Sequence, residues 1–265
     1  MTYKLGRIVK LISVAAISLN MFSVTHAQSL EEVLAGDHRS EANKARDKYR
    51  NPVETLNFFG IKDNMTVVEI APGGGWYQEV LAPYLNRNGK YVSATSDEGT
   101  DGYKREQARL AANPELYGNV TMVPLSGSVY GEENSADMVL SFRNYHNWTG
   151  RSEFEKLRAF YKTLKPGGIL GMVDHRSNDA GDGNGYTCEP CMIKDAEAIG
   201  FIYLGTSQIN ANPKDPKDHP GGVWNLPPVL SKNGLDENNL EEIQNGLKAI
   251  GESDRYTLKF AKPMH

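Results

Sequence analysis

The stretch Thr66-Val-Val-Glu-Ile-Ala-Pro-Gly-Gly-Gly-Trp76 contains a sharp change in the pattern of apolar and polar positions. Its β-branched residues suit a strand buried in a parallel sheet, and a helical pattern then continues to Leu85. The glycines between the two patterns let the backbone turn sharply and pass close to a ligand. The stretch therefore predicts a strand, a tight turn and a helix whose unpaired N–H groups point at whatever lies on the turn.

Strand and helix patterns alternate along the chain after this turn. Apolar, β-branched runs predict strands at 91–95, 120–123, 138–142, 169–173, 201–206 and 256–260. Helical patterns between them cover 103–112, 152–164 and 196–199. Strands separated by helices form parallel βαβ units, so we expect an α/β sheet with helices on both faces.

Residues 28–60 form a predicted helical lead-in. A capping box at Ser29 opens a short helix, a polar helical pattern covers 37–50, and a helix at 53–59 ends at Gly60. The polar stretch carries a group of charged side chains: His38, Arg39, Arg46, Asp47 and Arg50. They form either a solvated helix face or a cluster that folds over the ligand on the glycine turn and meets its carboxylate.

A long region without a strand pattern, 207–250, precedes the last predicted strand. It contains a loop rich in Pro, Gly and Asp at 212–222, followed by Val223-Trp-Asn-Leu-Pro-Pro228. Loops of this length are often lids or binding loops, and Trp224 offers an anchor that a disordered insertion lacks. A lid-like insertion and a flexible one are both open on this pattern.

The first 27 residues have the pattern of a secretory signal. Three basic residues precede an apolar stretch at about 11–24, and Thr25-His-Ala27 fits a cleavage site. The apolar stretch is short for a membrane span, and no cysteine follows it to accept a lipid. We therefore expect residues 1–27 to be a signal peptide, 28–265 to be one domain exported to the periplasm, and no stable membrane anchor after cleavage.

The charge balance bears on the kind of partner. The chain has 29 basic and 33 acidic residues, and residues 1–27 contain three of the basic and none of the acidic ones, which leaves a net charge of −7 beyond them. No basic block or arginine-rich stripe is present in the sequence. Nucleic acid is therefore disfavoured as a partner, and a small molecule is favoured. The sequence does not indicate the oligomeric state.

The glycine turn fits two ligand classes, dinucleotides and S-adenosylmethionine. Counted from Gly73, the third glycine of a dinucleotide motif falls on Gln78, which disfavours a nicotinamide-dependent oxidoreductase. Glu69 instead ends the strand four residues before Gly73. This spacing resembles the acid-x-G-x-G-x-G motif of class I S-adenosylmethionine-dependent methyltransferases, with Ala71 at the first glycine position.

Further motifs extend the resemblance over nearly the whole chain after residue 27. The run at 136–142 resembles the fourth strand of that family, and Leu164-Lys-Pro-Gly-Gly resembles the start of its fifth. The Pro-Gly-Gly-Gly turn and Val-Trp-x-Leu-Pro-Pro resemble a group of exported predicted methyltransferases. The resemblance implies a Rossmann-like, mostly parallel sheet of seven strands with an antiparallel last strand, and S-adenosylmethionine as cofactor.

Positions matching the family's cofactor site are Glu69, Ala71, Pro72, Gly73, Gly74, Gly75, Asp97, Ser128, Arg143 and Asn144. Two of these depart from the family's pattern. The acid that holds the ribose hydroxyls falls on Ser96, so Asp97, one residue later, is the candidate for that role. The acid near the adenine is absent, and Ser126-Gly-Ser128 occupies its region.

Candidate catalytic chemistry follows the fourth strand, at the edge where α/β sheets place their ligands. His146-Asn-Trp resembles the His-Asp-Trp of small-molecule O-methyltransferases, in which the histidine is the base. His146 is therefore the candidate base, with a purely structural histidine as the alternative. Because Asn147 replaces the acid, its amide is expected only to orient the ring. Candidate residues of the substrate pocket are Tyr145, His175 and Trp224.

Cys188-Glu-Pro-Cys191 contains both cysteines of the chain. In an exported protein, a short-range disulfide or two unreacted thiols are favoured over redox catalysis. One C-x-x-C supplies two ligands where a zinc site needs about four, so no metal is expected.

The sequence thus favours methyl transfer from S-adenosylmethionine to an unidentified small molecule. Export is in conflict with this cofactor, because a charged sulfonium made in the cytoplasm does not cross a bilayer unaided. A non-catalytic metabolite-binding protein on a methyltransferase scaffold is therefore the alternative.

Overall fold

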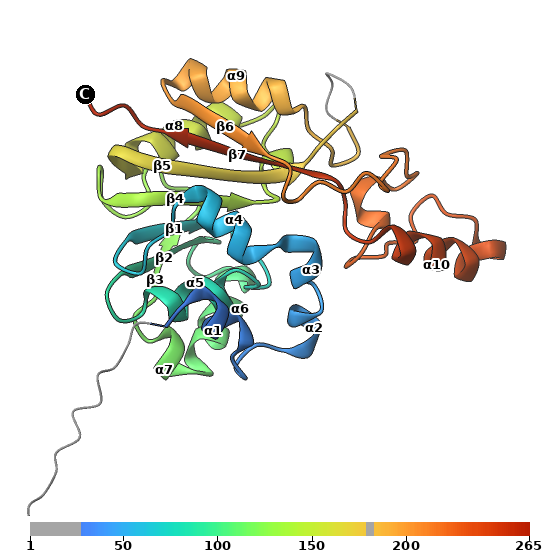
Figure 1. Cartoon of the computed structure of the whole chain (residues 1–265), viewed down its shortest axis with the longest axis horizontal. Coiled ribbons are helices and arrows are strands. Elements are labelled where there is room, and N and C mark those ends of the chain that lie inside the picture. Colours follow the sequence, from blue (N-terminus) through green and yellow to red (C-terminus); the bar gives the residue numbers. More distant parts are fainter. Residues whose placement is uncertain (1–27, 179–182) are drawn as a thin grey trace, which may run out of the picture.

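Within residues 28–178 and 183–265, which the computed structural model describes, seven strands form one sheet (Figure 1). The strands are β1 (Thr66–Ile70), β2 (Lys90–Thr95), β3 (Thr121–Pro124), β4 (Ala136–Phe142), β5 (Leu164–His175), β6 (Ile202–Ser207) and β7 (Arg255–Ala261). Their order is β3-β2-β1-β4-β5-β7-β6, and β7 runs antiparallel to both of its neighbours. The Rossmann-like sheet with an antiparallel last strand is therefore confirmed. The predicted signal at 1–27 lies outside the described residues.

Helices cover both faces of the sheet. The α-helices of the described residues are α1 (Leu30–Ala35), α2 (Glu41–Lys44), α3 (Asp47–Arg50), α4 (Pro52–Phe59), α5 (Gln78–Leu85), α6 (Asp101–Ala111), α7 (Pro114–Tyr117), α8 (Glu153–Thr163), α9 (Glu189–Ile199) and α10 (Leu240–Ile250). No helix in the described part of the chain is long and apolar enough to cross a membrane.

The alternation of side chains along β1 divides the core into two clusters. Val67 packs with the buried residues of α1, α4 and α5, whereas Val68 packs with those of α8 and α9. Successive side chains of a strand point to opposite faces, so a strand buried on both sides must be apolar at neighbouring positions. The continuous apolar run that marked this strand in the sequence is explained by these two clusters.

The lead-in differs from the single helix expected over 37–50. Ser40 caps α2, and α2 and α3 are separate four-residue helices. Arg39 is 2% exposed and donates two hydrogen bonds of 2.7 Å to Asp47, so part of the charged stretch is buried. The predicted capping box at Ser29 and the left-handed Gly60 after α4 are both present.

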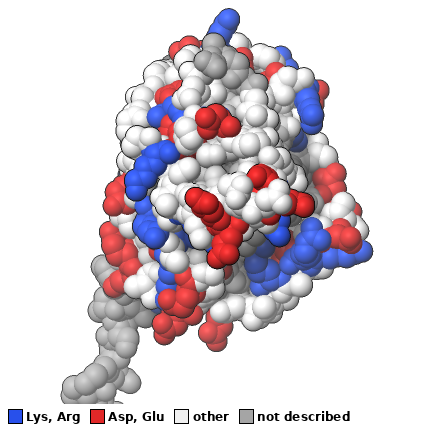
Figure 2. All heavy atoms as spheres, turned by 90° about the vertical axis from the view of Figure 1, so that its right-hand side faces the viewer, with Lys and Arg blue, Asp and Glu red and all other residues white. Residues whose placement is uncertain are grey.

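The region between β6 and β7 extends from one end of the sheet and contains α10, which was not predicted (Figure 1). Asp215 anchors it, because its carboxylate accepts hydrogen bonds from the Tyr186 hydroxyl, His219 Nε2 and two backbone N–H groups. This anchor holds the loop that carries Trp224 beside the ends of β4 and β5. Acidic and basic side chains are interspersed on the face at this end of the molecule (Figure 2).

Candidate functional site

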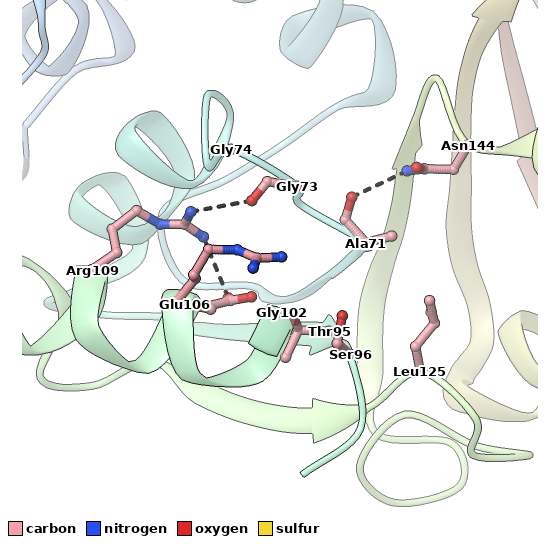
Figure 3. Close-up of a pocket in the computed structure, with 11 residues that line it drawn as sticks. Ala71, Gly73, Gly74, Thr95, Ser96, Gly102, Glu106, Arg109, Leu125 and Asn144 are labelled. Carbon is pink, nitrogen blue, oxygen red and sulfur yellow. Dashed lines mark hydrogen bonds and ion pairs between the residues drawn. The ribbon is translucent and has the colours of Figure 1, made fainter. Parts of the chain in front are cut away.

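Three cavities lie along the carboxyl edge of the parallel strands. The glycine cavity, of about 440 Å³, is lined by Ala71, Gly73, Gly74, Thr95, Ser96, Gly102, Arg105, Glu106, Arg109, Leu125 and Asn144 (Figure 3). The arginine cavity, of about 200 Å³, is lined by Asn43, Arg46, Arg50, Glu69, Ala71, Pro72, Gly73, Gly74, Trp76, Tyr77, Phe142, Arg143 and Asn144. The histidine cavity, also about 200 Å³, is lined by Arg143, His146, His175, Val223, Trp224, Pro227, Pro228, Val229 and Ser253.

The predicted glycine turn separates the first two cavities. The Asn144 amide donates to the carbonyl oxygen of Ile70 at 2.9 Å and to that of Ala71 at 3.4 Å, which ties the turn to the segment after β4 (Figure 3). Gly74 lines both cavities, and a Cβ built on it meets no atom within 4 Å. A ligand that spans the two cavities would therefore pass over Gly74.

Gly75 has a different role from the one expected of a cofactor-contacting glycine. It lines neither cavity, its φ is +80°, and a Cβ on it would lie 2.8 Å from Arg109 Nε. A glycine is required there by the left-handed backbone and by the packing of Arg109.

Glu69 lies at the end of β1 and is 2% exposed. The Tyr91 hydroxyl donates to Glu69 Oε2 at 2.6 Å. Burial raises the pKa of Glu69 to about 8, against the lowering effect of this hydrogen bond. Glu69 is consequently mostly protonated at neutral pH, and a donor or cation entering the arginine cavity would favour its ionised form.

The carboxyl group that lines the glycine cavity belongs to Glu106 of α6. It is 3% exposed and accepts hydrogen bonds from Ser93 and from Gln78 Nε2. No sequence pattern indicates Glu106 as a site residue, because only the packing of α6 on β2 brings it to the turn. Asp97 accepts from the Ser126 N–H at 3.2 Å, and neither Asp97 nor the exposed Ser128 is among the residues lining this cavity.

Four arginines surround one buried carboxylate beside the arginine cavity. Glu252 accepts from Arg46 Nε at 2.7 Å, Arg50 Nε at 3.3 Å and Arg255 Nη1 at 3.1 Å. Arg143 Nη1 lies 4.0 Å from it. Burial alone would raise the pKa of Glu252, but the four guanidinium groups lower it to about 2. The cluster therefore has an excess of positive charge.

Two donors of this cluster are left without a hydrogen-bond partner in the described part of the chain. They are the buried Nη2 atoms of Arg46 and Arg50, two residues that line the arginine cavity. Burial, and then the charge of Arg143, lower the pKa of Arg50 well below its ordinary value. Buried N–H groups almost always have a partner, so these two favour an anionic ligand group in the cavity.

His146 is paired with a carboxylate, but not with one from its own segment. Its Nδ1 lies 2.9 Å from Asp174 Oδ1, and its backbone N–H donates to Oδ2 at 2.9 Å. Burial by itself raises the pKa of Asp174, but the hydrogen bonds from the ring and the backbone N–H of His146 outweigh it and hold the pKa below its ordinary value. The acid that the sequence lacks at Asn147 is thus supplied by β5, as the ionised Asp174.

The candidate residues of the substrate pocket separate into two groups. His175 and Trp224 line the histidine cavity with His146, and His175 Nδ1 hydrogen-bonds to Ser253. Burial lowers the pKa of His175 well below its ordinary value, so its ring is neutral. Tyr145 was wrongly placed in the pocket: it is 1% exposed in the core, and its hydroxyl donates to Asp195 of α9 at 2.6 Å.

Two findings bear on the cysteines and on metal binding. Cys188 and Cys191 form a disulfide, one of the two states that the sequence left open. His146, Asp174 and His175 offer possible metal-ligand atoms within 4.8 Å of one another. The spacing of the two cysteines carries no information about this group. Arg143 lines the same cavity, and its positive charge disfavours a cation there.

No protein-family profile and no curated protein matches the sequence. Solved structures do match the fold. A SAM-dependent methyltransferase from Aquifex aeolicus is 18% identical with a TM-score of 0.52, over 63% of this chain and 87% of that one. The [4+2]-cyclase SpnF is 16% identical with a TM-score of 0.57, over 87% and 86% of the two chains.

A third structure shares the fold at a similar level. The 1,6-didemethyltoxoflavin-N1-methyltransferase of Burkholderia thailandensis, solved with 1,6-didemethyltoxoflavin and S-adenosylhomocysteine, is 14% identical with a TM-score of 0.52, over 86% of this chain and 83% of that one. At these identities the likeness concerns architecture alone. The chain therefore has the Rossmann-like fold of S-adenosylmethionine-dependent methyltransferases.

Proposed function

We propose that this protein transfers a methyl group from S-adenosylmethionine to a small-molecule acceptor. The observation that carries the proposal is Arg50, which lines the arginine cavity and has a buried Nη2 without a hydrogen-bond partner in the described part of the chain. This cavity shares the glycine turn with the larger glycine cavity. This cofactor has a nucleoside at one end and a carboxylate at the other. The pair of cavities offers space for the first and donors for the second.

The residues present fit the two ends of the cofactor. The nucleoside would occupy the glycine cavity, where Ser96 and Glu106 offer polar groups to the ribose, and Asp97 stays a candidate from the sequence. The carboxylate would pair with Arg46 and Arg50. This corresponds to the second of the two roles that the sequence left open for the charged lead-in residues. Gly74 leaves room for the ligand to pass between the cavities.

The bound cofactor supplies an electrophilic methyl group, and this chain's residues align the acceptor and keep out water. With its Nδ1–H donated to Asp174, His146 has a basic Nε2. That atom can take the proton of a hydroxyl or protonated amine in the histidine cavity. Asp174 would then stabilise the imidazolium that forms.

The pattern of residues 1–27 supports export to the periplasm as a further proposal. Export in turn favours the second candidate function, a non-catalytic metabolite-binding protein, because the sulfonium donor does not cross a bilayer unaided. N-terminal sequencing of protein from the cell envelope tests the proposed location. A start at Gln28 is expected, and an intact Met1 on cytoplasmic protein would contradict export.

Gly74→Leu tests whether the cofactor binds over the glycine turn. Its side chain would fill the open space over the turn without a left-handed backbone, so the free energy of unfolding should change by less than about 1 kcal/mol. The affinity for S-adenosylmethionine, measured by calorimetry, should fall by at least about 100-fold, or about 2.7 kcal/mol. Gly246→Leu, at an equally open position on α10, is the matched control. Unchanged affinity in Gly74→Leu would show that the cofactor does not bind over the glycine turn.

Arg50→Gln tests the carboxylate contact. Removing a charged donor should weaken S-adenosylmethionine by roughly 10- to 100-fold, corresponding to the ~1.5–3 kcal/mol of a charged hydrogen bond. Methylthioadenosine lacks the amino acid end, so its affinity should stay the same and also report that the variant is folded. Arg158→Gln removes an equal charge at an exposed position. Equal weakening of both ligands by Arg50→Gln would contradict the contact.

His146→Gln tests the base. The affinity for S-adenosylmethionine should not change, whereas the single-turnover rate with an identified acceptor should fall by ~10²- to 10⁴-fold. Asp174→Asn, which removes the carboxylate beside Nδ1, should slow the same step. His265→Gln, at an exposed position, is the control. A normal rate in His146→Gln would make this histidine structural.

A further inference from the structure

Arg143 lies between the two small cavities and lines both of them. Its backbone N–H donates to the Val173 carbonyl at 2.7 Å, and its φ of +62° is a left-handed value that is uncommon for a residue with a side chain. The end of β5 thus holds the backbone of Arg143 in place at the boundary where a methyl donor and an acceptor would meet.

The positive charge of Arg143 is poorly compensated. Its nearest carboxylate oxygen, Oε2 of Glu252, is 4.0 Å away and already accepts hydrogen bonds from Arg50 and Arg255. The buried Asp174 is engaged by His146 and by backbone N–H groups. Burial lowers the pKa of Arg143 to about 10, so the guanidinium is still charged at neutral pH.

One part of the lining of the histidine cavity is apolar. Trp224, Pro227, Pro228 and Val229 line it, and Trp224 and Val229 are 43% and 59% exposed. At about 200 Å³, the cavity is smaller than the roughly 300 Å³ at which typical ligand pockets begin. Aromatic and proline side chains offer flat contact surfaces, so a molecule with a single planar ring suits this apolar part of the cavity.

We infer that the acceptor is a small aromatic acid, whose anionic group pairs with Arg143 while its ring packs against Trp224 and the two prolines. That the bound acid accepts a methyl group rests on the proposed function. The recognition of the acid rests on the histidine cavity alone. A planar guanidinium pairs with a carboxylate through two parallel hydrogen bonds, which a neutral amide of the same shape cannot reproduce. The hydroxyl or amine on the ring would then be the group served by His146.

The test compares para-hydroxybenzoate with its neutral isostere para-hydroxybenzamide. Both are titrated by ligand-observed NMR against the whole protein, with and without saturating S-adenosylhomocysteine. The wild type should bind the acid at least about tenfold more tightly than the amide, a difference of about 1.4 kcal/mol. Arg143→Gln should reduce the affinity for the acid to that for the amide, and Trp224→Ala should weaken both.

Arg158→Gln, which removes an exposed arginine, should keep the preference for the acid. Equal affinities in the wild type, or no binding of either probe, would overturn the inference, and this comparison needs no variant. Retention of the preference in folded Arg143→Gln would overturn the role of that residue. Failure of S-adenosylhomocysteine to bind would instead contradict the proposed function, because the acid preference is also measured without it.

Discussion

Burial of several guanidinium groups around one carboxylate is the constraint on which the site depends. Glu252 is 2% exposed and joins arginines from α3, from the segment after β4 and from the start of β7. Leaving a buried charge without its partner costs several kcal/mol, so these three parts of the chain are held together. One carboxylate cannot neutralise four cations, so an excess of positive charge stays beside the arginine cavity.

The sheet explains why the remaining chemistry gathers at the same place. The turn after β1, the segment after β4 and the end of β5 lie together because neighbouring parallel strands end at one edge. His146 lies in the segment after β4 and Asp174 in the neighbouring β5, and the backbone N–H of His146 is bonded to the same carboxylate as its ring. One carboxylate of β5 therefore holds both the backbone and the ring of His146.

The sequence predicted the features that depend on local pattern. The strand at β1, its glycine turn, the capping box at Ser29 and the antiparallel last strand were all found, because each leaves a signal within a few residues or belongs to a family pattern. It also indicated His146, His175 and Trp224, which share one cavity.

What the sequence could not show was pairing over distance. Glu252 lies 206 residues from Arg46, and Glu106 and Asp174 become partners of the site only through the packing of α6 and the register of β5. Tyr145 was misplaced because a residue next to His146 can point to the opposite side, into the core. The pattern of the charged stretch at 37–50 predicts one helix, whereas in the structure α2 begins inside this stretch, with Ser40 as its N-cap.

The position of Glu252 near the end of the chain gives the site an order of assembly. A ribosome or a secretion channel releases Arg46, Arg50 and Arg143 well before their common counter-ion, which leads directly into β7. Like charges without a counter-ion resist burial, so the lead-in stays hydrated while the chain is incomplete. Burial of these arginines consequently waits for Glu252, so the lead-in and the segment after β4 take their final places only when almost the whole described chain has been made.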